Sequence, residues 1–172
     1  MKLLIASDIH GNLENTKRLL EKFTTSKADY LIILGDIYHG YSYEDSREMM
    51  NLFSHICQKL YLLRGNCDSD YDNEMSPVGL LKELKMKIGN RMIYFNHGHT
   101  GFPNAQFNPG DIYCHGHTHI SEITNYHDII VCNPGSISLP RGGTKASYMI
   151  IDEKQIIIYD FCDNIIKVYD LR

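Results

Sequence analysis

Short apolar runs alternate with longer segments of mixed character in the first half of the chain. Residues 2–6, 30–34 and 59–63 form almost wholly apolar runs of strand length, which is typical of strands buried on both faces. Between them, residues 13–23 and 43–58 carry apolar side chains at partly helical spacing, with charged residues in between. The order strand, helix, strand, helix, strand predicts right-handed crossovers and a parallel sheet with helices on its faces.

The pattern changes near residue 85, where short apolar runs follow one another without helical segments between them. Residues 86–88 and 91–95 flank Gly89-Asn90, which predicts a hairpin with a two-residue turn. Further runs separated by turn residues are interpreted as antiparallel strands: 111–114, 120–125, 129–132, 147–151, 155–161 and 165–169. We therefore expect an α/β fold, an αβ sandwich with one mostly parallel and one mostly antiparallel half. No repeat or linker interrupts the chain, so we expect a single domain over residues 1–172.

The composition is that of a folded globular chain. Its 172 residues are 43% hydrophobic and 22% charged, which argues against a wholly disordered protein. Seventeen basic and 21 acidic residues give a net charge of −4 without any basic run, which argues against strong electrostatic binding of nucleic acid. No apolar run approaches the roughly 20 residues of a membrane span. The chain start lacks a signal-peptide pattern and the five cysteines form no C-x-x-C pair, so we expect free thiols in a cytoplasmic protein.

Polar side chains of the metal-ligand types follow the apolar runs. The first three strands are followed by Asp8 and His10, by Asp36, and by Asn66-Cys67-Asp68. Five of the nine histidines lie within 23 residues of the second half: His97, His99, His115, His117 and His119. Taken alone, each of these clusters has an ordinary interpretation as a helix cap, a turn or surface polarity. Because ligand groups collect at the carboxyl ends of strands in an α/β sheet, we expect the clusters to converge on one site.

The chemistry of this set predicts a metal centre. Carboxylate, imidazole and amide oxygen without thiolate suit Mn²⁺, Fe, Zn²⁺ or Mg²⁺. Two divalent ions about 3.5–4 Å apart need a shared carboxylate, and Asp36 after the central strand of the three is the natural bridge. A centre with only two aspartates keeps an excess of positive charge, so it attracts an anionic phosphate ester and stabilises the charge that develops on it.

The order of these motifs resembles that of the calcineurin-like metallophosphoesterase superfamily. The motifs are D-x-H at 8–10, G-D at 35–36, G-N-C-D at 65–68, H-G-H at 97–99 and G-H-T-H at 116–119. S-D-I-H-G-N at 7–12, L-R-G-N-C-D at 63–68 and C-N-P-G-S-I-S-L-P-R-G-G at 132–143 are similar to its YfcE-type phosphodiesterase branch. The resemblance implies an αβ sandwich of two mixed β-sheets flanked by helices. It also implies a metal-dependent phosphodiesterase, a hydrolase of small-molecule phosphodiesters.

The resemblance also implies two sets of metal ligands, position by position. One ion would take Asp8, His10, Asp36 and His119, and the other would take Asp36, Asn66, His97 and His117. A hydroxide that bridges the two ions would attack phosphorus in line with the leaving oxygen. Manganese is the expected metal, with zinc, iron, nickel and magnesium as alternatives.

Further candidates surround these ligands. Cys67 stands where many superfamily members have a histidine, and it is either a poor proton donor or a packing residue. Since a thiol is a weaker acid than imidazolium, esters whose leaving groups need little protonation are the expected substrates, unless His99 or His39 substitutes for it. Asn12 either contacts a phosphate oxygen or caps the first helix. Asp68 either orients a neighbouring ligand or caps the next turn, and Arg141 either approaches a phosphate or is solvated.

Two other functions are compatible with the sequence. The YfcE-like fold is similar to that of the retromer scaffold subunit, so a protein-binding scaffold with vestigial activity is one alternative. A nuclease is the other, although the charge of −4 argues against it. The tyrosine-rich stretch Tyr38, Tyr41 and Tyr43 is either an exposed contact surface of a homo-oligomer or a lid over the site.

Overall fold

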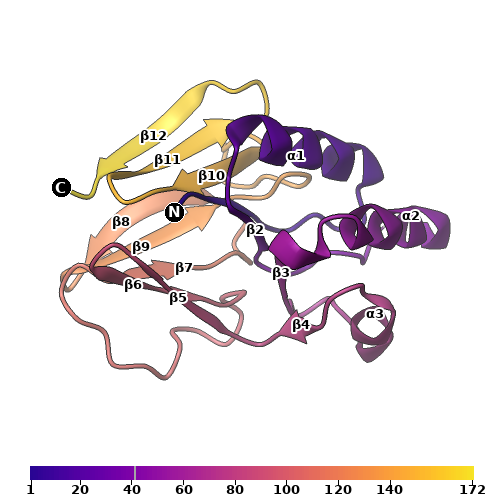
Figure 1. The fold of residues 1–172 in the computed structure, drawn as a ribbon, viewed down its shortest axis with the longest axis horizontal. Coiled ribbons are helices and arrows are strands. Elements are labelled where there is room, and N and C mark those ends of the chain that lie inside the picture. The colour runs from indigo at the N-terminus through magenta and orange to yellow at the C-terminus, as the bar shows by residue number, and fades with distance from the viewer. Residues whose placement is uncertain (41) are drawn as a thin grey trace.

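Two mixed β-sheets pack against each other in the computed structural model, which describes residues 1–40 and 42–172 (Figure 1). The seven-stranded sheet has the order β12-β11-β10-β1-β2-β3-β4, and the five-stranded sheet has the order β5-β6-β7-β9-β8. Side chains from the inner faces of both sheets form one apolar cluster, which includes Leu3, Ile5 and Ile32 from the first sheet and Ile93, Phe95 and Ile112 from the second. The expected sandwich of two mixed sheets is confirmed.

The larger sheet contains the first strands of the chain. Strands β1 to β4 run parallel, while three later strands run antiparallel along one edge. The bounds are β1 Leu3–Ala6, β2 Tyr30–Ile33, β3 Leu60–Leu63, β4 Leu80–Leu81, β10 Ser147–Ile151, β11 Gln155–Asp160 and β12 Ile165–Asp170. Strand β1 lies at the centre, because Leu3 pairs with Tyr30 on one side and with Ile151 on the other.

Helices α1 (Leu13–Ser26) and α2 (Tyr43–Ser54) cover the outer face of this sheet (Figure 1). They pack on it through a second apolar cluster that contains Leu19, Phe23 and Phe53. The expected helix over residues 43–58 ends early, because the chain turns at His55 into the 3₁₀-helix η1 (Cys57–Lys59). A short helix that the apolar pattern did not predict, α3 (Asp70–Met75), begins after the capping box of Ser69 and Asp72.

The smaller sheet contains β5 (Leu84–Ile88), β6 (Arg91–Phe95), β7 (Ile112–Cys114), β8 (Ser121–Tyr126) and β9 (Ile129–Pro134). The predicted hairpin of β5 and β6 is confirmed. The interpretation of residues 111–114 as an antiparallel strand is wrong, since β7 runs parallel to both β6 and β9. Residues 96–111 form a long connection that returns the chain to the start of the sheet, which a parallel pair requires. As a result, β6 and β7 end at the same edge.

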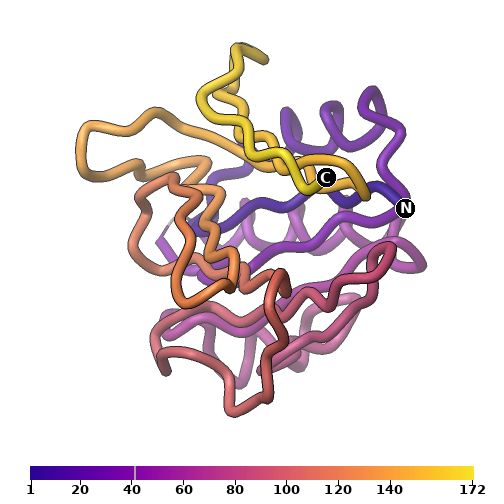
Figure 2. Tube along the Cα trace, turned by 90° about the vertical axis from the view of Figure 1, so that its left-hand side faces the viewer, coloured from indigo at the N-terminus to yellow at the C-terminus, as the bar shows by residue number. Residues whose placement is uncertain are grey.

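The loop between β9 and β10 projects from the two sheets (Figure 2). The five cysteines are free thiols, as expected. Among the described residues, no helix is both long enough and apolar enough to cross a membrane.

The inner face of β11 provides a test of the sandwich core. Ile158 is fully buried there, whereas Ile165 on the edge strand β12 is 60% exposed. We expect Ile158→Ala to lower the free energy of unfolding by about 2–5 kcal/mol, because it leaves a cavity between the sheets. Ile165→Ala is the matched control, and its effect should stay within about 0.5 kcal/mol. Urea unfolding measures both, and equal destabilisation by the two changes would contradict this packing.

Candidate metal centre

The loops after the strands bring the predicted ligands to one edge of the sandwich. The Asp8 and His10 amides donate to the carbonyl oxygens of Gly35 (3.1 Å) and Asp36 (2.9 Å), so the loops after β1 and β2 lie side by side. The Gly116 amide donates to the carbonyl oxygen of His97 at 3.0 Å, which joins the loops after β6 and β7. Parallel strands therefore present their ligands to a common point.

The backbone of the ligand loops is unusual. Five of the seven predicted ligands adopt the left-handed conformation, with φ of 54° at Asp8, 49° at His10, 50° at Asp36, 67° at His117 and 63° at His119. This conformation costs roughly 1–2 kcal/mol for a residue with a side chain. Strained residues of this kind cluster at functional sites, where the surrounding structure holds them in place.

The donor atoms of Asp8, His10, Asp36 and His119 form the first group, and all lie within 4.8 Å of one another. His119 Nε2 is 3.3 Å from both His10 Nε2 and Asp8 Oδ1. On the other side of Asp36, His97 Nε2 lies 3.4 Å from Asp36 Oδ1 and 3.2 Å from Asn66 Oδ1. Asp36 Oδ2 faces His10 at 3.8 Å, so the two oxygens of this carboxylate face two different groups of donors.

His117 belongs to the second group. Its ring centroid is 5.3 Å from that of His97, and its backbone amide donates to Asp8 Oδ2 at 3.1 Å. The side chain is exposed, unlike that of the buried His97. Asn66 is also exposed and lies at the open side of the centre.

Backbone carbonyl groups fix the tautomer of two of the histidines. His97 Nδ1 donates to the carbonyl oxygen of Leu34, and His119 Nδ1 donates to that of Leu139, each at 2.7 Å. Because a carbonyl oxygen can only accept, Nδ1 carries the proton and the Nε2 lone pair points into the centre. There it meets carboxylate oxygens, which also carry only lone pairs.

The buried Asp8 Oδ1 shows what such a set of acceptors requires. This atom receives no hydrogen bond within the described residues. A buried carboxylate oxygen without a donor is costly unless a cation compensates it. Lone pairs from carboxylate, imidazole and amide groups that face one another fit divalent metal ions, and the carbonyl partners of the two histidines are typical of metal-ligating imidazoles.

The same carboxylates shift the pKa values of the neighbouring histidines. Protonation of His119 would place an Nε2–H donor against the Asp8 carboxylate, and this raises the pKa of His119. Burial lowers the pKa of His97, but the hydrogen bond to Asp36 and its charge outweigh burial and raise that pKa overall. Burial also raises the pKa of Asp36, yet His97 and the Cys67 amide hold it well below its ordinary value. The centre thus attracts positive charge.

The Asp68 side chain holds together the backbone of two loops that form the centre. Its Oδ2 accepts the amides of Asp36 (2.9 Å) and Gly65 (2.8 Å), and its Oδ1 accepts that of Ile37 (2.8 Å). The side chain is buried, and burial raises its pKa despite these three donors. Since Ser69 caps α3, the interpretation of Asp68 as a cap is wrong and its role as an orienting residue is the one observed.

Two residues that the sequence pattern did not single out, Asn133 and Ser136, also support the centre. The buried Asn133 side chain donates to the Gly116 carbonyl oxygen at 2.8 Å and to Thr118 Oγ1 at 3.0 Å. Ser136 Oγ donates to the Asp8 carbonyl oxygen at 2.7 Å. Asn133 thus binds the residues on either side of His117, and Ser136 binds the backbone of Asp8. The signal that could have found them was the C-N-P-G-S motif of the family resemblance, because loop composition alone did not distinguish them.

The remaining candidates occupy different places. His99 is exposed, with its ring 5.4 Å from that of His97 and 6.2 Å from that of His117. The Cys67 amide donates to Asp36 Oδ1 at 2.8 Å, and burial together with Asp36 raises the pKa of its thiol to about 11. His39 is exposed on the loop after β2.

Asn12 and Arg141 lie beside ligand loops. Asn12 Oδ1 accepts the Asn15 amide at 3.0 Å, so its side chain caps α1. Arg141 is exposed, and its amide donates to the carbonyl oxygen of His119 at 3.1 Å. The loop of Arg141 therefore borders the first group of donors.

The structure places Tyr38 of the tyrosine-rich stretch in the core, rather than on an exposed contact surface or in a lid. Tyr38 is only 2% exposed, and its hydroxyl lies 3.1 Å from that of Ser76. Its ring packs against Phe53 with 6.4 Å between the ring centroids, so Tyr38 belongs to the core. Tyr43 is 60% exposed, and Tyr41 lies outside the described residues.

Comparisons with known proteins agree with this geometry. The family model of the calcineurin-like phosphoesterase superfamily domain matches residues 1–155. Phosphodiesterase YfcE of Escherichia coli (strain K12) is 35% identical over 164 residues, which cover 88% of this chain and 88% of YfcE. The solved structure of the YfcE phosphoesterase from E. coli matches all of both chains with a TM-score of 0.91 and 31% identity. The structure of Vps29 from Entamoeba histolytica complexed with Zn²⁺ covers all of both chains with a TM-score of 0.67 and 19% identity, which shows a shared fold alone.

The close approach of Gly65 to Asp36 provides a test of the centre. A Cβ atom at Gly65 would lie 2.0 Å from Asp36 Oδ1. We expect Gly65→Ala to weaken Mn²⁺ binding by at least about 10- to 100-fold, the usual effect of disturbing the support of a ligand, because the carboxylate must move. Isothermal titration calorimetry measures this affinity.

Gly79→Ala is the matched control, since a Cβ atom there meets nothing within 4 Å, and its affinity should equal that of the parent. Asp68→Asn is a second test with little change of shape, and it should also weaken binding, because an amide group cannot accept all three backbone amides as the carboxylate does. Parent-like affinity in both Gly65→Ala and Asp68→Asn would rule out this arrangement of Asp36.

Proposed function

The chain belongs to the calcineurin-like phosphoesterase superfamily, as its motifs indicated, and we propose that it is a phosphodiesterase that works with two divalent metal ions. The observation that supports two ions is the position of Asp36, whose Oδ2 faces His10 and whose Oδ1 faces His97. The name of the 35% identical relative, phosphodiesterase YfcE, supports a diester as the substrate.

In this proposal, each metal ion has its own set of ligands. Asp8, His10, Asp36 and His119 hold the first ion, and Asp36, Asn66, His97 and His117 hold the second. Bound ions would supply Lewis-acid stabilisation of the phosphoryl oxygens and would activate the attacking water. Two carboxylates offset only part of the charge of two divalent ions, so the ligand set leaves the centre attractive to an anionic diester.

The groups around the centre have proposed roles toward the substrate. His99 lies beside both His97 and His117, so we assign it to contact with the bound phosphodiester. His39, Asn12 and Cys67 stay assigned to the rim that receives the substrate. With its pKa at about 11, the Cys67 thiol gives up its proton less readily than imidazolium does. The enzyme should therefore prefer esters whose leaving groups need little protonation.

The choice of metal is part of the proposal. Manganese suits an oxygen and imidazole ligand set, and zinc, iron, nickel or magnesium can bind the same donor types, so availability decides among them. Free thiols accord with a reducing compartment, and a cytoplasmic location is included in the proposal. The substrate is a small-molecule phosphodiester rather than nucleic acid, because the chain carries a net charge of −4.

Removal of the bridging charge tests the mechanism. Asp36→Asn keeps the size of the side chain but removes the charge that both groups of donors share. Turnover of bis(p-nitrophenyl) phosphate with Mn²⁺ should fall at least about 10²–10³-fold. His127→Asn, in the turn between β8 and β9, is the control and should keep parent turnover. If Asp36→Asn retained parent turnover, the shared-carboxylate mechanism would be wrong.

A protein-binding scaffold is the second candidate, and it comes from the resemblance of the sequence to the retromer scaffold subunit. Metal analysis of the purified protein after incubation with Mn²⁺ separates the two functions. A content near two ions per chain together with diester turnover supports the enzyme. Absence of both supports the scaffold.

A further inference from the structure

A cavity of about 620 Å³ opens beside the metal centre. His97 and His99 line one side of it, so the cavity begins where the scissile phosphate of the proposed reaction would lie. Arg64, Lys82 and Thr100 line the other parts of the cavity. Its volume lies within the 300–1,000 Å³ that is typical of small-molecule sites, which leaves room for one organic group of a diester.

Arg64 is held in the wall of this cavity. It follows β3 directly and precedes the loop of Asn66. Its Nε donates to the Asp68 carbonyl oxygen at 3.3 Å, and its Nη2 forms an ion pair with Asp70 Oδ1 at 2.7 Å. These contacts leave Nη1 of the guanidinium as a further donor and keep the group from moving away.

Lys82 differs from Arg64 because its ammonium group pairs with no side chain among the described residues. It lies between β4 and β5 and is exposed. Over residues 1–40 and 42–172, the Lys82 ammonium takes part in no hydrogen bond or ion pair. Glu83 lines both this cavity and the neighbouring cavity beside Tyr94, whereas Lys82 lines only this one.

We infer that this cavity binds one of the two organic groups of the diester and that Lys82, with Arg64, selects a group that carries a second anion, a carboxylate or a phosphate. The inference rests on the proposed phosphodiesterase function and adds its specificity. An ammonium without a protein partner is free to pair with a ligand, and at the rim of a site its contribution depends on ionic strength. The metal centre would bind the scissile phosphate, and the cavity would bind the second charge.

The test compares two diesters that differ only in a carboxylate on each ring. Diphenyl phosphate and bis(3-carboxyphenyl) phosphate carry the same group on both sides, so the cavity meets that group whichever alcohol leaves. Their inhibition constants are measured against bis(p-nitrophenyl) phosphate with the Mn²⁺-loaded protein. We expect the carboxylated diester to bind about fivefold more tightly, the scale of a partly exposed ion pair, and the preference to shrink at high salt.

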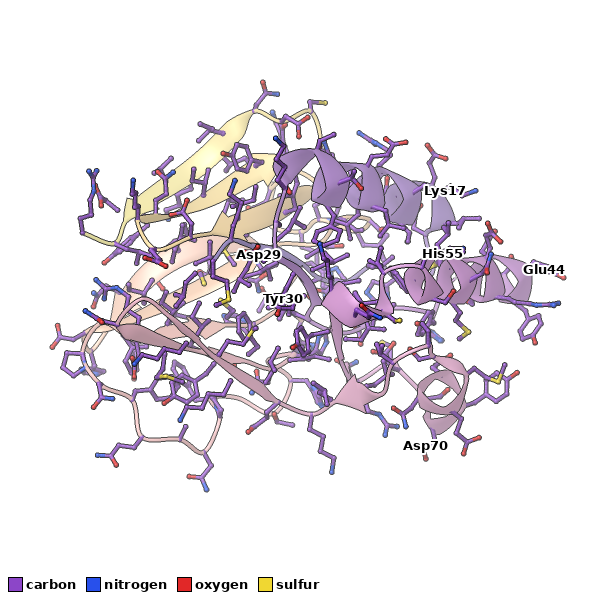
Figure 3. All side chains as sticks on the ribbon, in the orientation of Figure 1. Lys17, Asp29, Tyr30, Glu44, His55 and Asp70 are labelled. Carbon is purple, nitrogen blue, oxygen red and sulfur yellow. The ribbon has the colours of Figure 1, made fainter. Side chains whose placement is uncertain are left out.

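Matched variants of Lys82 assign the preference to this side chain. Lys82→Glu should abolish or reverse the ratio of the two inhibition constants, and Lys82→Arg should keep it. Lys17→Glu is the control for net charge, because Lys17 lies on α1 on the opposite side of the molecule from Asp70, the partner of Arg64 (Figure 3). That variant should keep the parent ratio.

The possible outcomes separate this inference from the proposed function. If the parent shows no preference, or if Lys17→Glu removes it as fully as Lys82→Glu does, the assignment to the cavity is overturned. If the chromogenic diester is not hydrolysed, the proposed function fails, and calorimetric dissociation constants of the two diesters with the Mn²⁺-loaded protein then give the same ratio. A ratio that responds to Lys82 alone supports the cavity in either case.

Discussion

The buried carboxylate of Asp68 joins the two loops on which the metal centre depends. It accepts the amides of Asp36 and Ile37 from the loop after β2 and that of Gly65 from the loop after β3. A buried charge is costly unless hydrogen bonds compensate it, and these backbone donors provide that compensation. The same bonds fix the position of Asp36, whose two oxygens face two groups of donors. The position of Asp36 is therefore a consequence of Asp68, a residue outside the predicted ligand set.

The left-handed conformations of five of the predicted ligands follow from a similar constraint. Side chains at the ends of five strands must turn toward one point, and an extended backbone would carry them past it. The structure offsets the resulting strain with hydrogen bonds between loops, such as those of Asn133 and Ser136. Gly116 allows the loops to meet, because a Cβ atom there would lie 1.9 Å from Ser7 Oγ. Small and polar residues around the predicted ligands thus hold the loops that carry these ligands in place.

The apolar pattern predicted most strands and both long helices. Each of these elements buries a continuous face, and its apolar residues recur at regular spacing within one segment of the chain. The direction of β7 could not be predicted, because it depends on the path of residues 96–111 rather than on local pattern. The ligand types were evident from the sequence, whereas Asp68 kept two alternative roles there and Asn133 had none. Both act through backbone amides and carbonyls of distant residues, and such partners leave no trace in local composition. Tyr38 was misplaced for a related reason, since its partner Phe53 lies in another element.

The candidate metal centre gathers polar groups that repel one another, whereas the sandwich needs an apolar interior. The topology keeps the two apart. Acceptors that face acceptors, as Asp8 and His119 do, destabilise the fold unless a cation lies between them. The apolar clusters on both faces of the seven-stranded sheet supply the stability that holds these groups together. Parallel strands end at one edge, so the repulsive groups gather there and leave the interior apolar. A cation at that edge then meets a preformed set of lone pairs, and its binding energy is not spent on assembling them.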